Sequence, residues 1–358
     1  MFGSWRSLRA AGVAALVLFA GALTASAQSF VLDLPRESPA ATVSQRIGLT
    51  DMEVTYSRPL VKGRKIWGAL VPYDQVWRAG ANHNTTLMVS DPFTFAGQAV
   101  AAGTYGVHMI PGKETWTVIL SKESGVWGSY TYDQKEDAVR VTVKPIEAPM
   151  HEALEYSFEE IKDNGATLTL AWEKLAVPVP IGLDANAITK AKVERQLRDL
   201  PKWTWESWND AANWALSTKV YNEDALKWAD ESIKLEERFD NLDTKAQVLT
   251  AMGKPAEAQA VMAKALPKAN TLQRHQYARR LLNEKKVDEA LAIFRDNVKK
   301  SPDTWYVYGG LARGLSAKGD YKTAAAQMAE ALKRAPADVK PQLQGMLERL
   351  QKGEDINS

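Results

Sequence analysis

Residues 57–86 gather cationic and aromatic side chains in a stretch that lacks the alternation of its flanks. A long loop in a compact domain is frequently functional. Arg guanidinium groups bind carboxylates and sulfates through paired hydrogen bonds, and the faces of Trp rings stack on sugars or cations. The stretch therefore predicts a site for a carboxylate, a sulfate or a sugar acid. Its candidate ligand-binding residues are Arg58, Lys62, Arg64, Trp67, Trp77, Arg78, Asn82 and His83.

Two other interpretations of this loop stay open. In the first, the Arg side chains donate to carbonyl groups of their own loop and the Trp rings close the end of the domain, because a long loop must satisfy its own backbone. In the second, Asn82, His83 and Thr85 form a catalytic group. The interpretations differ in whether the arginines converge on an open pocket or are satisfied within the loop.

Motifs of known catalytic chemistry are few in this chain. It has no Cys and four His, and no two His have the spacing of metal ligands. We therefore expect no metal site, no cofactor and no Cys nucleophile. Serine-hydrolase, P-loop and dinucleotide fingerprints are also absent from the sequence. We assign no catalytic residue, but a glycosidase-like pair of carboxylates stays open because such residues lie far apart in sequence.

The first 27 residues have the pattern of a secretory signal peptide. Arg6 and Arg9 precede an apolar stretch at 10–23, and residues 25–27 read Ala-Ser-Ala. We predict cleavage after Ala27 and a periplasmic or secreted bacterial protein, with an uncleaved anchor as the alternative. The apolar stretch is shorter than the roughly 20 residues of a spanning helix, so we expect no membrane span after cleavage.

The charge of the chain excludes some partners. Lys and Arg number 45 and Asp and Glu 43, and the signal peptide holds two of the Arg, so the mature chain is close to neutral. This gives no electrostatic reason to expect nucleic acid or an anionic membrane as a partner. The absence of Cys excludes disulfides and a lipoprotein anchor, so packing alone must stabilise the fold.

Residues 28–180 show apolar residues in alternation, which is typical of half-buried strands. Asn164-Gly165 is a hairpin signal, and we expect Pro178 and Pro180 to close the domain. Short strands joined by tight turns predict an all-β sandwich or jelly-roll-like domain. The clearest strand runs are 42–47, 52–56, 86–89, 105–110, 116–120, 139–143, 154–158 and 168–172.

From residue 186 onward the apolar period changes to 3.6, and the pattern recurs about every 33 residues. Small residues are expected where paired helices approach closely, with larger apolar residues filling the space between them. Pro302 and Pro336 would stop the second helix of a pair. One column of the pattern consists of Ala225, Ala258, Ala290 and Ala324, and another of Leu216, Leu249, Leu281 and Leu315.

This pattern resembles the tetratricopeptide repeat, an all-α solenoid in which helix pairs stack as a superhelix. After a linker with a helix at 181–203, we expect four copies at 204–237, 241–270, 271–303 and 304–337. A capping helix at 338–351 and a polar tail at 352–358 would follow. The tryptophans expected to pack the junction with the β domain are Trp203, Trp205, Trp208, Trp214 and Trp228. An array of this kind predicts a protein or peptide partner.

The β domain also carries motifs of a known family over about residues 35–180. They are Tyr-Ser-Arg-Pro-x-Val-Lys-Gly-Arg (56–64), Ile-Trp-Gly-x-Leu-Val-Pro-Tyr (66–73), Val-Trp-Arg-x-Gly-Ala-Asn (76–82) and Ala-Gly-Thr-Tyr (102–105). With these motifs the chain resembles the bacterial family called domain of unknown function 2911. The resemblance implies an exported β domain and transfers no reaction. The family pattern commonly has an acidic residue after Gly-Ala-Asn, where this chain has His83, so any ligand at that position would meet a different charge.

Two functions follow from these features. The first is an exported binding or scaffold protein, in which the helical repeats dock a protein or peptide and the β domain binds a ligand. The alternative is a carbohydrate-active hydrolase or lyase, with the repeats as its docking module. Either way, the β domain has a possible carbohydrate or anionic ligand.

Overall fold

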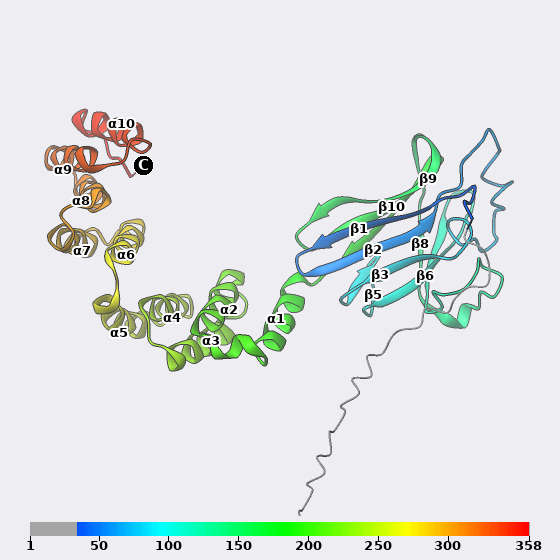
Figure 1. Ribbon diagram of the computed structural model, residues 1–358, viewed down its shortest axis with the longest axis horizontal. Helices are drawn as coiled ribbons and strands as arrows, with labels where there is room; N and C mark the ends of the chain where they lie inside the picture. The colour runs from blue at the N-terminus through cyan, green and yellow to red at the C-terminus, as the bar shows by residue number, and fades with distance from the viewer. Residues whose placement is uncertain (1–33, 358) are drawn as a thin grey trace, which may run out of the picture.

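The computed structural model describes residues 34–357. Figure 1 shows a β domain of two sheets followed by an array of helices, which confirms the predicted fold class. The predicted signal peptide lies outside the described residues. Over residues 34–357, no helix has both the length and the apolar content that crossing a bilayer requires.

The β domain consists of two antiparallel sheets. The six-stranded sheet has the order β1-β2-β3-β6-β7-β8, and the four-stranded sheet has the order β5-β4-β10-β9. The strands of the first sheet are β1 (Ala40–Ile47), β2 (Thr50–Ser57), β3 (Thr85–Val89), β6 (Gly103–Ile110), β7 (Trp116–Ser121) and β8 (Asp137–Val143). Those of the second are β4 (Phe93–Phe95), β5 (Gln98–Val100), β9 (Ile146–Lys162) and β10 (Gly165–Gly182).

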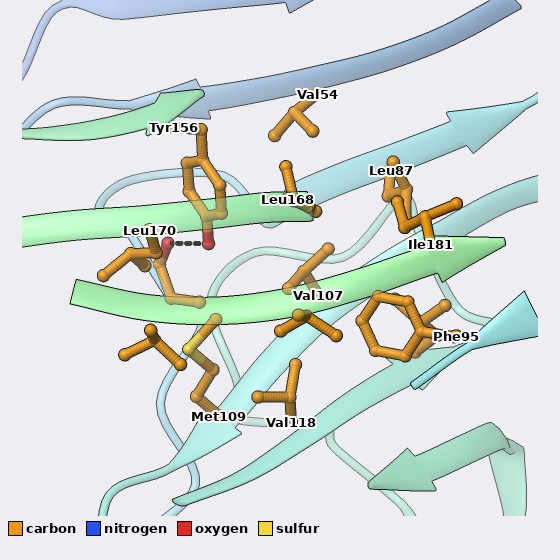
Figure 2. Close-up of a cluster of buried hydrophobic side chains, with 14 of the residues drawn as sticks. Val54, Leu87, Phe95, Val107, Met109, Val118, Tyr156, Leu168, Leu170 and Ile181 are labelled. Carbon is orange, nitrogen blue, oxygen red and sulfur yellow. Dashed lines mark hydrogen bonds between the residues drawn. The ribbon is translucent and has the colours of Figure 1, made fainter. Parts of the chain in front are cut away.

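The inner faces of the two sheets meet in one apolar core (Figure 2). Val54, Leu87 and Val107 enter it from the six-stranded sheet, and Leu168 and Ile181 enter it from β10. These five side chains are at most 3% exposed. Full burial of such a side chain stabilises the fold by about 1.5–3 kcal/mol, so this core holds the domain together without disulfides.

Strand β10 continues past the point where the sequence predicted the end of the domain. Pro178 and Pro180 lie inside this strand, which ends two residues after Pro180, at Gly182. Proline cannot donate to a ladder, but it can accept, and Ala96 N donates to Pro180 O at 2.8 Å. The strand also bends back on itself, because Leu183 N donates to Asn164 O at 2.8 Å.

The turn between β9 and β10 lies one residue earlier than the Asn-Gly signal indicates. β9 ends at Lys162 and β10 begins at Gly165, which leaves residues 163–164 in the turn. Gly165 does not have a positive φ. A Cβ at Gly165 would lie 2.3 Å from Ile181 O. The glycine is therefore required by a close approach of two backbone segments.

Ten helices follow β10 in the described part of the chain, and α2 to α9 form four antiparallel pairs that α10 covers at the end (Figure 1). The first five are α1 (Ala185–Gln196), α2 (Trp205–Thr218), α3 (Asn222–Leu235), α4 (Phe239–Ala251) and α5 (Pro255–Ala265). The others are α6 (Thr271–Asn283), α7 (Val287–Lys300), α8 (Trp305–Ala317), α9 (Tyr321–Arg334) and α10 (Lys340–Gln351).

Helix α1 joins the two parts of the molecule and uses two opposite faces. On one face Ile188 packs into the β core, and Lys192 forms an ion pair with Asp91 at 2.6 Å. On the other face Lys190 pairs with a carboxylate of α3 at 3.3 Å, and Leu197, just after the helix, packs with α2 and α3. Ile188 and Lys192 are four residues apart, and Lys190 and Leu197 are seven apart. Both spacings place two side chains on the same face of a helix.

The two columns of the repeat pattern lie mostly inside the array. In the leucine column Leu249, Leu281 and Leu315 are buried, whereas Leu216 in the first copy is half-buried. The alanine column lies where the helices of a pair meet, and each member is at most 6% exposed: Ala225, Ala258, Ala290 and Ala324.

The array is interrupted between its second and third helix pairs. The first helices of neighbouring pairs approach each other closely in α2–α4 and α6–α8, whereas neither α4 nor α5 approaches α6 to a comparable extent. The α-helix before this seam is shorter than its counterparts, since α5 has 11 residues where α3, α7 and α9 have 14. Pro267 follows α5 in a 3-10 turn, and a proline stops an α-helix because it lacks an N–H and crowds the preceding turn. The expected superhelix is therefore divided into an inner block, α2–α5, and an outer block, α6–α10.

Polar contacts connect the two blocks at this seam. Gln273 Nε2 donates to both carboxylate oxygens of Asp240, at 2.9 and 3.0 Å. The Arg280 guanidinium donates two hydrogen bonds to Asp243. Tyr277 packs against the apolar cores of both blocks. The seam is thus held by side chains, while the helix backbones remain separated.

The tryptophans of the first repeat have a different place from the one the sequence predicted. The ring centroids of Trp214 and Trp228 lie 6.4 Å apart, and both rings belong to the core of α2 and α3. Trp203 is 69% exposed. The contact with the β domain is made by α1, so the expectation that these tryptophans pack the junction is wrong. The helix predicted within 181–203 is α1 (Ala185–Gln196), but its apolar residues lie on two faces and form no single stripe, so the sequence did not indicate that it makes the contact with the β domain.

Candidate functional site

The loop between β2 and β3 spans residues 58–84 and lies across one end of the β domain. Short bridges tie it to the sheets, with Leu60 paired to Ala153 and Trp77 paired to Met109. In the second bridge each backbone N–H donates to the other residue's carbonyl oxygen, both at 2.8 Å. These bonds satisfy the backbone of a long loop and fix the positions of its side chains.

Trp67 has a structural place in this loop. It is 8% exposed, and its ring meets those of Trp77, Trp116 and Trp172 edge-on at centroid distances of 6.0, 4.8 and 5.7 Å. Such edge-to-face contacts add to the apolar burial of the rings. Trp67 therefore plugs the end of the domain, as the structural interpretation expects, whereas Trp77 is only partly buried.

Two of the arginines are engaged by backbone carbonyls. Arg58 Nε donates to Leu154 O at 2.9 Å, and its Nη2 reaches Glu155 at 3.4 Å. Arg58 thus ties the loop to β9. The Arg64 guanidinium donates to two carbonyl oxygens of its own loop, one of them Val61 O at 3.1 Å. Because carbonyl oxygens are uncharged, these hydrogen bonds leave the positive charge of Arg64 without a counter-ion.

Asn82 and His83 make contacts of their own and do not line the cavity beside this loop. Asn82 Nδ2 donates to Ser38 O at 3.0 Å, and its φ of 58° is left-handed, a conformation that Asn tolerates. The His83 ring stands edge-on to Trp127 at 4.3 Å, and the Arg36 guanidinium lies 5.3 Å from the centre of the same Trp127 ring. His83 therefore takes part in a surface stack and in no catalytic arrangement with Asn82.

Arg78 has the fewest hydrogen-bond partners among the candidate arginines. Its Nε is buried and has no acceptor, and among the described residues no carboxylate forms an ion pair with it. Its Nη1 lies against Gly128, where a Cβ would be only 2.4 Å away. Gly128 has a φ of 72°, so this glycine serves both the turn and the space for the guanidinium.

A cavity of about 250 Å³ opens beside this loop. Lys62, Arg64, Trp77 and Arg78 all line it, so the structure brings four of the eight candidates together. Arg58, Trp67, Asn82 and His83 do not line it. The other lining residues are Glu37, Ser38, Pro59, Leu60, Leu70, Val71, Gly80, Ala81 and Trp172.

The cavity is positively charged and has an aromatic wall. Glu37 is the one carboxylate among its lining residues, and it pairs with Lys62 at 3.7 Å while remaining largely exposed. Trp77 and Trp172 stack with centroids 6.0 Å apart and planes 20° apart. Trp77 Nε1 donates to Gly80 O at 3.1 Å, whereas Trp172 Nε1 is buried without an acceptor.

Sequence reasoning missed a polar network under the segment 122–136. His108 Nδ1 and Ser129 Oγ are 2.9 Å apart. Tyr132 Oη donates to Asp137 at 2.9 Å, and Arg140 Nη2 donates to Tyr132 Oη at 2.6 Å. The strand that contains Arg140 was predicted at 139–143. Nothing in the sequence indicated that residues 122–136 fold back over His108.

This network has poor properties for catalysis. The Ser129–His108 distance is that of a nucleophile and its base, but burial lowers the pKa of His108 to about 4, against a smaller opposing effect of Asp137. A base with so low a pKa accepts a proton weakly at neutral pH. Asp137 is engaged by Tyr132 and Arg140 and does not orient the imidazole. Burial, with the hydrogen bond to Asp137, also raises the pKa of Tyr132 to about 12.

The acidic pair before the β9–β10 turn is engaged by neighbouring hydroxyl groups. Glu159 accepts from Ser157 and Thr169, and Glu160 accepts from Thr167, all on β9 and β10. Within residues 34–357, no group of three or more His, Asp or Glu side chains is arranged to hold a metal ion.

The helical array contains a second and larger depression at the seam between its blocks. This seam groove has a volume of about 950 Å³. Its floor is apolar and buried, with Ala246, Ala258, Met262 and Leu281 each at most 6% exposed. Its rim is polar and mixed in charge, formed by Lys219, Asn222, Gln247, Gln259, Arg280, Glu284, Lys286 and Glu289.

Comparison with known proteins gives a family match for the β domain and likenesses to solved structures. Residues 38–181 match the profile of a family described as protein of unknown function (DUF2911), which confirms the resemblance drawn from the loop motifs. No curated protein matches the chain. Two solved structures resemble less than half of it. YrrB, described as a TPR protein with an unusual peptide-binding site, is 17% identical; the match covers 45% of this chain and 84% of YrrB, with a TM-score of 0.31. Residues 41 to the end of MamA from Desulfovibrio magneticus RS-1 are 16% identical; the match covers 42% of this chain and 97% of that one, with a TM-score of 0.30.

Proposed function

We propose that this protein is an exported interaction scaffold. In this proposal the seam groove binds a segment of another protein, and the β domain binds a small ligand in the cavity beside the loop 58–84. The observation that carries the proposal is the seam groove itself, about 950 Å³ in volume. Ligand clefts commonly span about 300–1,000 Å³, so this groove has room for a short peptide segment.

The floor of the groove calls for an apolar occupant. Helix pairs normally cover such residues by stacking on the next pair, but the short α5 leaves Met262 and Leu281 at the bottom of an open depression. A bulky apolar side chain placed there would bury its own apolar surface, at about 25 cal/mol per Å². The partner segment should therefore carry at least one large apolar residue.

The rim of the groove calls for a segment without strong net charge. Lys286 is paired with Glu284 at 2.7 Å, and Arg280 is held by Asp243, so the nearby charges are largely compensated. The rim also carries the amide side chains of Asn222, Gln247 and Gln259, and such groups can donate to and accept from a peptide backbone. The expected partner is thus an uncharged apolar segment whose backbone bonds to amide side chains.

A displayed library of random peptides, selected on the mature full-length protein, tests this proposal. We expect the selected peptides to share a bulky apolar residue and few charges. Ala256 is exposed and lines the groove, so Ala256→Trp should occupy the space and weaken a selected fluorescent peptide at least tenfold. That loss corresponds to about 1.4 kcal/mol.

Ala263→Trp supplies the matched control, because Ala263 is exposed on the same helix, about two turns further on, and does not line the groove. Its affinity for the peptide should stay within about twofold of the parent. Equal binding of the peptide to parent and Ala256→Trp protein would refute the groove as the docking site.

Export is tested separately by the mass of the secreted chain. Cleavage after Ala27 predicts a mature protein that begins at Gln28. Mass spectrometry of the protein recovered from the periplasm or medium of a bacterial host should show this terminus. Recovery of the uncleaved chain in the cytoplasm would contradict it.

A further inference from the structure

We propose that the cavity beside the loop 58–84 binds a small organic carboxylate attached to a single ring. This inference deepens the ligand-binding role proposed for the β domain and names its ligand class. The evidence for it is the charge, the aromatic wall and the size of the cavity. Two kinds of compound carry a carboxylate on a ring, sugar acids and aromatic acids, and experiment can distinguish between them.

The charge of the lining selects an anion. Lys62, Arg64 and Arg78 oppose a single carboxylate, Glu37, which is exposed to water. The bonds of Arg64 go to carbonyl oxygens, so its charge is available to a ligand. Guanidinium groups bind carboxylates through planar, paired hydrogen bonds. A charge-assisted bond of this kind is about twice as strong as a neutral one.

The aromatic wall selects a ring next to the anion, because an indole face packs against the face of a sugar or an aromatic ring. Trp77 is partly buried and stacks on Trp172, so one side of this pair borders the cavity. A ring would lie against the indole face that borders the cavity.

The size of the cavity limits the ligand to one ring. Its volume of about 250 Å³ equals that of about eight water molecules in the liquid. This lies just below the range of clefts that hold drug-sized molecules. A polymer could enter only with a terminal unit, and a single sugar acid or benzoate-sized acid fits the volume.

Isothermal titration of the mature full-length protein with D-glucuronate and with benzoate tests the inference. We expect saturable binding of at least one, which identifies the source of the carboxylate. D-glucose and benzyl alcohol share the ring and lack the carboxylate, so they should bind at least tenfold more weakly. Sodium sulfate should compete, because it meets the same cations without the ring.

Arg64→Gln and Lys65→Gln form a matched pair of variants. Both remove one positive charge from the same loop, but Lys65 does not line the cavity. Arg64→Gln should weaken the carboxylate at least tenfold, and Lys65→Gln less than twofold. Because Arg64 also ties the loop, Lys62→Gln gives a second test with little structural cost, since the Lys62 side chain has only its exposed pair with Glu37. It should weaken binding at least threefold.

Three results would overturn the inference. They are no saturable binding of either acid, equal binding of acid and alcohol, and equal losses in Arg64→Gln and Lys65→Gln. The groove proposal stands apart from these results, because Arg64→Gln protein should still bind the selected peptide and Ala256→Trp protein should still bind the acid. Loss of one activity without the other shows which proposal has failed.

Discussion

Individual side chains in the loop 58–84 divide between holding the fold and facing solvent. Trp67 is enclosed by three other indoles, and Arg58 ties the loop to β9. Lys62, Arg64 and Trp77 instead face a common cavity. Residues of the same type thus have different roles within a few positions. The reason is that side chains in an irregular loop have no common face, so each one meets different neighbours.

Buried histidines should make the stability of both halves depend on pH. Burial lowers the pKa of His108 in the β domain and of His275 in the array to about 4, below the usual value of about 6.5. The unfolded chain then binds protons between these values while the folded chain does not. The free energy of unfolding should therefore fall as pH decreases from about 6.5 to about 4. For the fully enclosed His108 the loss is on the order of 2–3 kcal/mol.

Urea unfolding at pH 7, 5.5 and 4.5 measures this dependence. His108→Gln should reduce the loss of stability in the β domain and leave that of the array unchanged, and His275→Gln should do the reverse. Each variant thereby serves as the control for the other. An undiminished pH dependence in His108→Gln protein would show that another group is responsible.

Within the helices, small residues set how closely neighbouring elements approach. A Cβ at Gly310 of α8 would lie 2.6 Å from the Phe294 ring and 2.7 Å from His275 Nδ1. A Cβ at Gly309, one position earlier, would meet nothing within 4 Å. The same helix thus contains one glycine that packing requires and one that it does not.

Gly310→Ala and Gly309→Ala should change stability in opposite directions. The first forces an overpacked contact and should lower the free energy of unfolding by about 1–3 kcal/mol. The second replaces a poor helix former without a clash and should raise it by up to about 1 kcal/mol. Thermal unfolding followed by circular dichroism compares them, and a stabilised Gly310→Ala protein would contradict the packing described.

The elements of this fold were largely predictable, but the break in the array was not. Alternation and repeat columns indicated the strands and helix pairs, because burial of one face imposes a period on the sequence. The columns at Ala258 and Ala290 continue in register across the seam, so the period hides the gap. Pro267 was the only local sign of it. The site was predictable as a loop, yet the division between Trp67 and Trp77 depends on contacts with β7 and β10 that lie far away in sequence.

At the scale of the whole molecule, two apolar cores lie on either side of α1. The β core ends at Ile188, and the core of the first repeat begins around Val193 and Leu197. Separate cores with few residues in common should unfold as separate units.

Ala290→Leu tests this division. Ala290 is fully buried between helices of the outer block, so the larger side chain should overpack the contact and cost about 1–3 kcal/mol. Calorimetry should show a lower melting temperature for the array and an unchanged transition for the β domain. Ala292→Leu, at an exposed position of the same helix, should change neither. Joint melting of both halves at a lower temperature would refute the division.

The two-faced character of α1 has a further consequence for orientation. Each residue of an α-helix advances the azimuth by about 100°, so the register between the Ile188–Lys192 face and the Lys190–Leu197 face fixes the direction in which the array leaves the β domain. One alanine inserted after Lys192 would rotate the later face by that angle while lengthening the helix by only about 1.5 Å. The rotation between the two faces of α1, more than the length of the helix, therefore determines the direction of the array relative to the β domain.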